Sequence, residues 1–181
     1  MLRITIPPTE SWDEEAGCFL ITKEYNLQLE HSLVSLSKWE SKWKKPFYSR
    51  EDKTYEETID YIRCMTITQN VPQEAYNAVS NDIINQVSAY IEDTMTATTF
   101  TEKRQATGNN GEMITSELIY YWMIALQIPM ECQKWHLNRL LTLVRVCNIK
   151  NAPPKKMGRK ETMNRNRSLN AARRARLNSK G

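Results

Sequence analysis

The stretch Ile114–Cys147 most constrains what this chain can fold into. It contains the longest apolar run of the chain, the nine residues Leu118–Leu126. We predict two helices joined by a tight turn at Gln127–Pro129, because proline is tolerated in the first turn of a helix, where its missing N–H breaks no bond. Ser116 is the predicted N-cap of the first helix. A helical hairpin this apolar must be covered by the rest of the chain or by a partner.

Three further helices are predicted upstream from apolar residues that recur at helical spacing. They cover His31–Lys45, Tyr55–Thr66 and Ser80–Glu92. Each has a hydroxyl side chain at its start that can accept hydrogen bonds from the free N–H groups of the first turn. These caps are Ser32, Thr54 and Ser80, and Glu57 completes a capping box with Thr54.

Short β-strands are predicted around these helices. Arg3–Ile6 alternates before Pro7–Pro8 ends it, and Trp12–Gly17 is an acidic loop. Phe19–Thr22 and Asn26–Glu30 are predicted to pair in a hairpin. This hairpin would turn at Lys23–Tyr25.

A second hairpin is predicted between Met95–Phe100 and Met113–Thr115, around the polar loop Thr101–Gly111. Together these patterns predict a mainly α fold (α+β minor). It would be a helical domain with small β-hairpins over residues 1–150. A linker marked by Pro153–Pro154 and a basic tail would follow over residues 151–181, with the linker beginning at Asn148.

The composition indicates a soluble cytoplasmic protein. No apolar run approaches the roughly 20 residues that span a bilayer, so we expect no membrane association. The N-terminus has no signal-peptide pattern and turns acidic at once. The four cysteines are irregularly spaced, which is more typical of reduced thiols than of a disulfide framework.

The net charge of +4 conceals a division along the chain. Residues 155–181 carry ten Lys and Arg against one acid, a net charge of +9. Residues 1–154 carry 15 basic and 20 acidic side chains, a net charge of −5. An acidic body with a basic tail is more informative about partners than the total charge.

Catalysis has little support in the sequence. His31 and His136 are the only near-neutral bases, and neither a phosphate-binding glycine loop nor a nucleophile motif is present. Cys132 and His136 are spaced i,i+4 on a predicted helix, which suits two ligands of one metal. A structural zinc needs four ligands, and Cys147 lies about four turns away. We therefore predict no enzyme, no metal and no cofactor.

A group of apolar side chains near the C-terminal end of the hairpin is the candidate partner-binding surface. Its members are Trp135, Leu140, Leu141 and Val144, and the Tyr120–Trp122 cluster allows the same interpretation. Apolar stripes at helical spacing usually pack inward, so a hydrophobic core is the preferred interpretation. Trp39 and Trp43, among lysines, could similarly stack on nucleic-acid bases, although inward packing is again preferred.

The basic tail is the strongest functional signal. The residues that would carry its function are Arg159, Lys160, Arg165, Arg167, Arg173, Arg174 and Arg176. They could neutralise nucleic-acid phosphates, bind an acidic protein or keep a disordered end soluble. The segment Glu161–Leu177 is compatible with a helix but lacks a convincing apolar face, so alone it would be marginal or disordered.

Three segments of this sequence resemble the tail assembly chaperones, a family of proteins encoded by tailed bacteriophages. They are SELIYYWMIALQIP, CQKWHLNRLLTLVRVCNIKNAPPKKM and RNRSLNAARRARLNSKG, all within Ile114–Gly181. The resemblance implies a non-enzymatic cytoplasmic protein that holds the long, aggregation-prone tape-measure protein while the tail tube polymerises around it. It assigns no individual site residues.

The leading hypothesis is therefore a tail assembly chaperone that binds a protein client through helix-to-helix apolar contacts. A nucleic-acid-binding factor that acts through the basic tail is the first alternative. A structural component of the virion is the second. A homo-oligomer is compatible with each of these.

Overall fold

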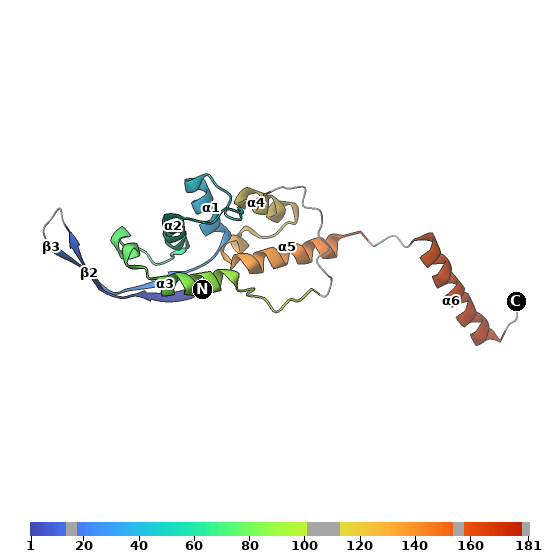
Figure 1. Cartoon of the computed structure of the whole chain (residues 1–181). Helices are drawn as coiled ribbons and strands as arrows, with labels where there is room; N and C mark the ends of the chain where they lie inside the picture. Colours follow the sequence, from blue (N-terminus) through green and yellow to red (C-terminus); the bar gives the residue numbers. More distant parts are fainter. Residues whose placement is uncertain (14–17, 101–112, 154–157, 179–181) are drawn as a thin grey trace. The chain divides into compact units, whose positions relative to one another are not determined.

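The protein is mainly helical, and the part of the chain that the structure describes contains one antiparallel β-hairpin (Figure 1). A computed structural model describes residues 1–13, 18–100, 113–153 and 158–178. These residues form two compact units, Met1–Asn148 and Ile149–Gly181. The predicted fold class, mainly α with minor β, is confirmed.

The N-terminal hairpin has two arms, each made of two short strands. They are β1 (Leu2–Ile6), β2 (Thr9–Asp13), β3 (Cys18–Thr22) and β4 (Tyr25–Leu29). β1 pairs with β4 and β2 pairs with β3. The register is continuous, since Ile6 faces Tyr25 and Thr9 faces Thr22. Strand pairing is interrupted only between Ile6 and Thr9, at Pro7 and Pro8, which have no N–H to donate to the partner arm.

The predicted turn at Lys23–Tyr25 is wrong, because Phe19–Thr22 pairs with residues 9–12 of the first arm. Trp12 and Asp13, which were expected in an acidic loop, belong to β2, and residues 14–17 of that loop lie outside the described ranges. Alternation of apolar and polar residues along a strand identifies the strand but not its partner. The short break between β3 and β4, which lies opposite Pro7 and Pro8, therefore has the sequence pattern of a turn.

The outer edge of β4 is covered by the segment 65–68. Glu30 N–H donates to the Met65 carbonyl at 3.0 Å, and Ile67 N–H donates to the Gln28 carbonyl at 2.8 Å. Gln28 N–H donates to Thr68 Oγ1 at 2.9 Å. This segment therefore occupies backbone groups of β4 that would otherwise be available to another strand.

Three α-helices begin at the predicted caps. They are α1 (Leu33–Trp43), α2 (Tyr55–Met65) and α3 (Asn81–Glu92), and the 3₁₀ helix η1 (Gln73–Ala78) precedes α3. The caps Ser32, Thr54 and Ser80 each accept a hydrogen bond from the N–H three residues further on, which confirms all three predictions. Glu57 also completes the predicted capping box by accepting from Thr54 N–H at 2.9 Å.

The apolar stretch forms α4 (Ser116–Ala125), the 3₁₀ helix η2 (Met130–Lys134) and α5 (Leu137–Asn151). The expected turn is present, and Gln127 adopts a left-handed conformation there with φ of 54°. The predicted N-cap is wrong by one residue. Thr115 accepts the capping bond from Leu118 N–H, and Ser116 is buried in the first turn.

The second helix of this pair is interrupted at Trp135 and His136. Leu137 N–H donates to the His31 carbonyl at 2.7 Å, and His136 forms an antiparallel bridge with Ser32. These backbone contacts with the segment before α1 hold residues 135–136 extended, so one continuous helix cannot form. The spacing of apolar residues in the sequence predicts which side chains are buried, but it cannot predict this pairing with a segment more than a hundred residues earlier.

The predicted hairpin between Met95–Phe100 and Met113–Thr115 is also wrong, because neither segment is a strand. Met95 N–H donates to Asp93 Oδ1 at 2.9 Å, and Thr98 N–H donates to Thr96 Oγ1 at 3.1 Å. Such local side-chain bonds compete with a β-ladder for backbone groups. The loop expected at residues 101–111 lies outside the described ranges.

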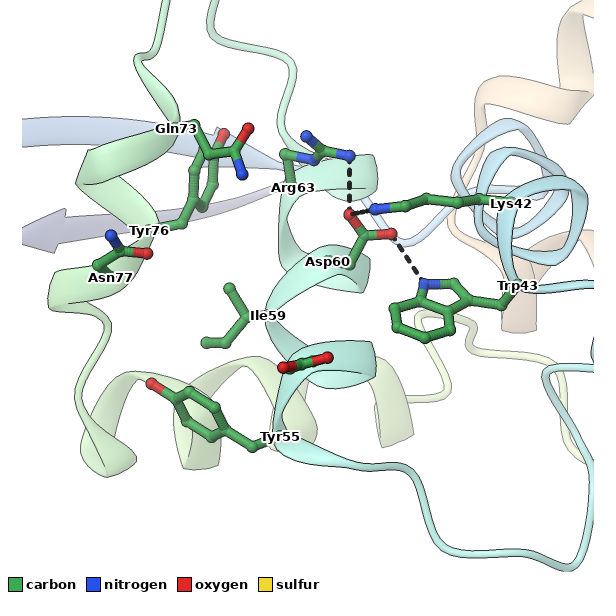
Figure 2. A pocket seen from close by; sticks show the side chains of 10 residues that line it. Lys42, Trp43, Tyr55, Ile59, Asp60, Arg63, Gln73, Tyr76 and Asn77 are labelled. Carbon is green, nitrogen blue, oxygen red and sulfur yellow. Dashed lines mark hydrogen bonds and ion pairs between the residues drawn. The ribbon is translucent and has the colours of Figure 1, made fainter.

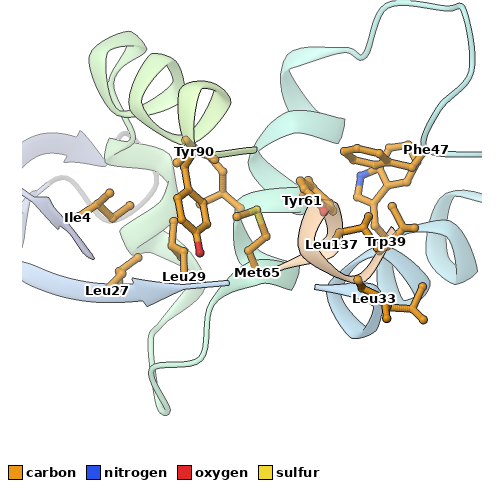
Figure 3. Packing of buried hydrophobic residues seen from close by; sticks show 14 of the residues in the cluster. Ile4, Leu27, Leu29, Leu33, Trp39, Phe47, Tyr61, Met65, Tyr90 and Leu137 are labelled. Atoms are coloured by element: carbon orange, nitrogen blue, oxygen red, sulfur yellow. The ribbon is translucent and has the colours of Figure 1, made fainter. Parts of the chain in front are cut away.

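The hydrophobic core runs from the face of the hairpin to an aromatic cluster between α1 and α2 (Figure 3). Trp39 is 1% exposed and its Nε1 donates to the Glu57 carbonyl at 2.8 Å. Phe47 lies against Tyr61, with ring centroids 4.3 Å apart. Trp43 is half-buried, and the preferred inward packing of Trp39 is confirmed.

The second unit contains α6 (Arg159–Leu177), which is the helix that the sequence indicated only as marginal. All of its described side chains are exposed. The linker expected from Asn148 starts later, because α5 continues to Asn151. None of the helices in the described ranges is long and apolar enough to cross a membrane.

Glu40 of α1 joins three segments through one buried carboxylate, which is 8% exposed. Its Oε1 accepts from Phe47 N–H at 2.8 Å, and its Oε2 accepts from Ser116 N–H at 2.7 Å. Ser116 N–H is at the positive end of the α4 dipole, where a negative charge is favourable. Glu40 therefore fixes both the loop after α1 and the start of α4.

We predict that Glu40→Gln lowers the free energy of unfolding by about 2–3 kcal/mol, since an amide cannot accept from both N–H groups and retain the charge. Urea unfolding followed by circular dichroism measures this. The matched control is Glu117→Gln, an exposed acid in the first turn of α4, which should cost less than about 1 kcal/mol. Equal losses for the two variants would contradict the role of Glu40.

Candidate functional site

The four predicted partner-binding residues do not form one accessible surface. Leu140 and Val144 are buried in the core, with exposures of 0% and 5%. Leu141 is half-buried, and Trp135 is half-buried beneath the Arg139 guanidinium, which lies 4.2 Å from its ring centroid. Leu140 and Val144 are therefore core residues, which was the preferred interpretation of this stripe.

An exposed apolar surface instead lies on α4. Ile119 and Met123 face the core and are fully buried, whereas Tyr121 and Ile124 on the opposite side are 64% and 68% exposed. Ala125 is exposed beside them. We call Tyr121, Ile124 and Ala125 the α4 surface.

The sequence indicated Tyr121, within Tyr120–Trp122, but did not identify Ile124 or Ala125, because Leu118–Leu126 is apolar on every side of the helix. A helix of this kind gives no periodic signal about which side packs inward. The available signal is that a helix on the surface of a small domain can bury only part of its circumference. Some of this run therefore had to remain accessible.

A pocket of about 510 Å³ lies between the end of α1, α2 and η1 (Figure 2). Asp60 lies at its side, and its carboxylate binds Lys42, Arg63 at 2.8 Å and Trp43 Nε1 at 2.9 Å. Burial alone would raise the pKa of Asp60, but hydrogen bonds from Lys42 and Trp43, with the charge of Arg63, lower it overall.

Asp60 is thus ionised and already engaged by three side chains. A general base needs an oxygen within hydrogen-bond reach of a substrate proton. In this pocket the carboxylate instead joins α1 to α2, while Tyr55 and Ile59 of α2 lie on the side of that helix toward η1 (Figure 2). The arrangement is that of a structural ion pair beside an open pocket lined by both polar and apolar side chains.

The two histidines lie together inside the body, with ring centroids 5.2 Å apart. His31 Nδ1 contacts the Tyr61 hydroxyl, and His136 Nε2 donates to the Tyr90 carbonyl at 3.0 Å. A carbonyl can only accept, so Nδ1 of a neutral His136 carries no proton. Within the described residues, His31 Nε2 and His136 Nδ1 have no hydrogen-bond partner.

Both rings are held neutral. Burial, with a smaller contribution from His136, lowers the pKa of His31 to about 3. Burial also lowers the pKa of His136, although the Tyr90 carbonyl opposes the shift. The pair therefore connects the segment before α1 to the start of α5, and neither ring faces solvent as a catalytic base would.

The predicted relation between Cys132 and His136 does not hold, because Cys132 lies in η2 and His136 follows the end of that helix. Cys132 is buried at 6% exposure, as expected for a small apolar side chain. In the described ranges, no group of three or more His, Cys, Asp or Glu side chains is arranged to hold a metal ion.

The predicted basic residues all lie on α6, which gives them a fixed helical spacing. They are Arg159, Lys160, Arg165, Arg167, Arg173, Arg174 and Arg176, and every one is exposed.

A scan against protein-family models and searches of curated proteins and solved structures find no match to this chain. The site must therefore be judged on its own residues.

The histidine pair predicts acid sensitivity. The pKa of His31 is lower in the folded protein than its ordinary value of about 6.5, so the unfolded chain binds more protons between pH 6.5 and 3. Stability therefore falls as pH falls through this window, by about 2 kcal/mol between pH 7 and pH 5. Urea unfolding at several pH values measures this.

The control is His31→Gln, which removes one titrating group and should make the dependence above pH 5 shallower, whereas His136, whose pKa burial also lowers, still contributes. The carboxylates of Glu57 and Asp60 have lowered pKa values and contribute their acid sensitivity at lower pH. Parallel pH profiles for the two proteins between pH 5 and 7 would contradict the assignment.

Proposed function

We propose that this protein is a non-enzymatic tail assembly chaperone of a tailed bacteriophage, which acts in the host cytoplasm on the tape-measure protein. The observation that carries the proposal is the α4 surface. Tyr121 and Ile124 have the greatest exposure of the large apolar side chains described in the first unit. The resemblance of Ile114–Gly181 to this family provides the class of client.

The α4 surface suits a helical client. Tyr121, Ile124 and Ala125 recur at i, i+3 and i+4, so they form one side of the helix and can pack against the apolar side of another helix. Full burial of one such large side chain contributes about 1.5–3 kcal/mol. Two of them favour weak, reversible binding, which suits a helper that must release its client.

The other chemical features support a binding role. Asp60 is engaged by Lys42, Arg63 and Trp43, and the histidines are buried and neutral. These groups stabilise the fold and are not arranged around a reacting atom. A protein whose polar groups are used in this way acts through its surface.

We predict that Ile124→Asp reduces capture of the tape-measure protein by about 10–100-fold, because it places a charge where the client buries an apolar side chain. The measurement is co-purification with fragments of the proposed tape-measure client. Ile67→Asp is the matched control, since Ile67 is 49% exposed on the segment that covers β4. Circular dichroism verifies that both variants fold.

Two results would overturn the proposal. One is a well-folded wild-type protein that retains no tape-measure fragment. The other is undiminished capture by Ile124→Asp. Mass spectrometry of mature particles tests the alternative of a structural virion component, because a chaperone should be absent from them.

A further inference from the structure

The helix α6 has a chemistry unlike that of the body. It spans Arg159–Leu177, and its seven basic side chains are accompanied by one acid, Glu161. Its three large apolar side chains, Met163, Leu169 and Leu177, fall within about 120° of the helix circumference but are about 9 and 12 Å apart along its axis, so they form no continuous apolar stripe. Packing of α6 into an apolar groove of another protein therefore has little support.

The basic side chains form two rows on α6. At about 100° per residue, Lys160, Arg167 and Arg174 align in one row, with successive members about 10.5 Å apart. Arg165 and Arg176 align in a second row, about 170° around the helix from the first. The two rows therefore flank the helix on opposite sides.

The two faces between the rows differ. One carries the amides Asn166 and Asn170, one turn apart, together with Arg159 and Arg173. The three separated apolar residues are on this face as well. The other face is made mainly of small side chains, with no basic residue and with the single acid of the helix. Its members are Ala171, Ala172, Ala175, Ser168, Asn164 and Glu161. The helix thus has an amide-bearing face bordered by positive charge on both sides and a back of mainly small side chains that holds its one acid.

This pattern matches a groove lined by phosphates on both walls. The major groove of B-form DNA is about 12 Å wide and admits an α-helix, whereas the major groove of A-form RNA is too narrow for side chains to read. Arginine and lysine contact phosphates, and asparagine can bond to the edge of adenine. A polyanion would also relieve the repulsion among the like charges of α6.

We propose that α6 binds duplex DNA in the major groove. The rows Lys160–Arg167–Arg174 and Arg165–Arg176 contact the two phosphate backbones, and Asn166 and Asn170 face the base edges. This site is separate from the α4 surface, and it holds whether or not the chaperone proposal does.

The experiment is fluorescence anisotropy of the full-length protein with a labelled 25-base-pair duplex DNA between 50 and 200 mM salt. If the five basic side chains of the two rows contact phosphates, affinity should fall by about 500-fold across this range. Lys160→Gln with Arg167→Gln and Arg174→Gln should make the slope of log affinity against log salt shallower by about three.

The matched control is Ala171→Gln with Ala175→Gln, which alters the small face without a change in charge and should leave affinity within about twofold. A second control permutes the α6 sequence so that its composition is kept and the rows are lost, and it should bind at least tenfold more weakly. The proposal is overturned if the permuted helix binds equally well. It is also overturned if duplex RNA, single strands or polyglutamate bind as tightly as duplex DNA.

Discussion

The buried carboxylate of Glu40 is the interaction on which the arrangement of the helical body most depends. It holds the backbone of Phe47 and of Ser116, which are 69 positions apart in the sequence. Phe47 in turn reaches Tyr61 in the aromatic cluster, and Ser116 starts α4. Because a helix start is fixed in both position and direction, this contact also decides which side of α4 faces the core.

Three of the four predicted helix caps are confirmed, whereas the long-range pairings of this fold could not be predicted from the sequence. The caps Ser32, Thr54 and Ser80 bond to N–H groups three residues away, so the sequence contains both partners within one short window. The interruption at Trp135 and His136 depends on backbone groups more than a hundred positions earlier. No local pattern reports such a partner.

The candidate site follows the same rule. The basic residues of α6 were identified from composition, because charge that stays in solvent needs no tertiary partner. Of the predicted apolar surface, Leu140 and Val144 belong to the core, whereas Ile124 was not singled out. An all-apolar run does not indicate which side will be buried, and that choice is made by contacts such as the one from Glu40.

Two kinds of recognition are thus proposed for two separate units of one chain. Apolar contacts on α4 are insensitive to salt, whereas phosphate contacts on α6 weaken steeply as salt rises. Ionic strength would therefore tune one activity and leave the other nearly unchanged. The two can be studied apart in one full-length protein without truncation.

The N-terminal hairpin has a consequence for the pairing of its edges with strands from other chains. Residues 65–68 bond to the outer edge of β4, and Pro7–Pro8 divides the opposite arm into two segments of five residues. An incoming strand would need an unbroken row of N–H and C=O groups to extend the sheet. Because the two prolines interrupt this row, the arm offers no long continuous edge to which strands of other chains could add to form fibres.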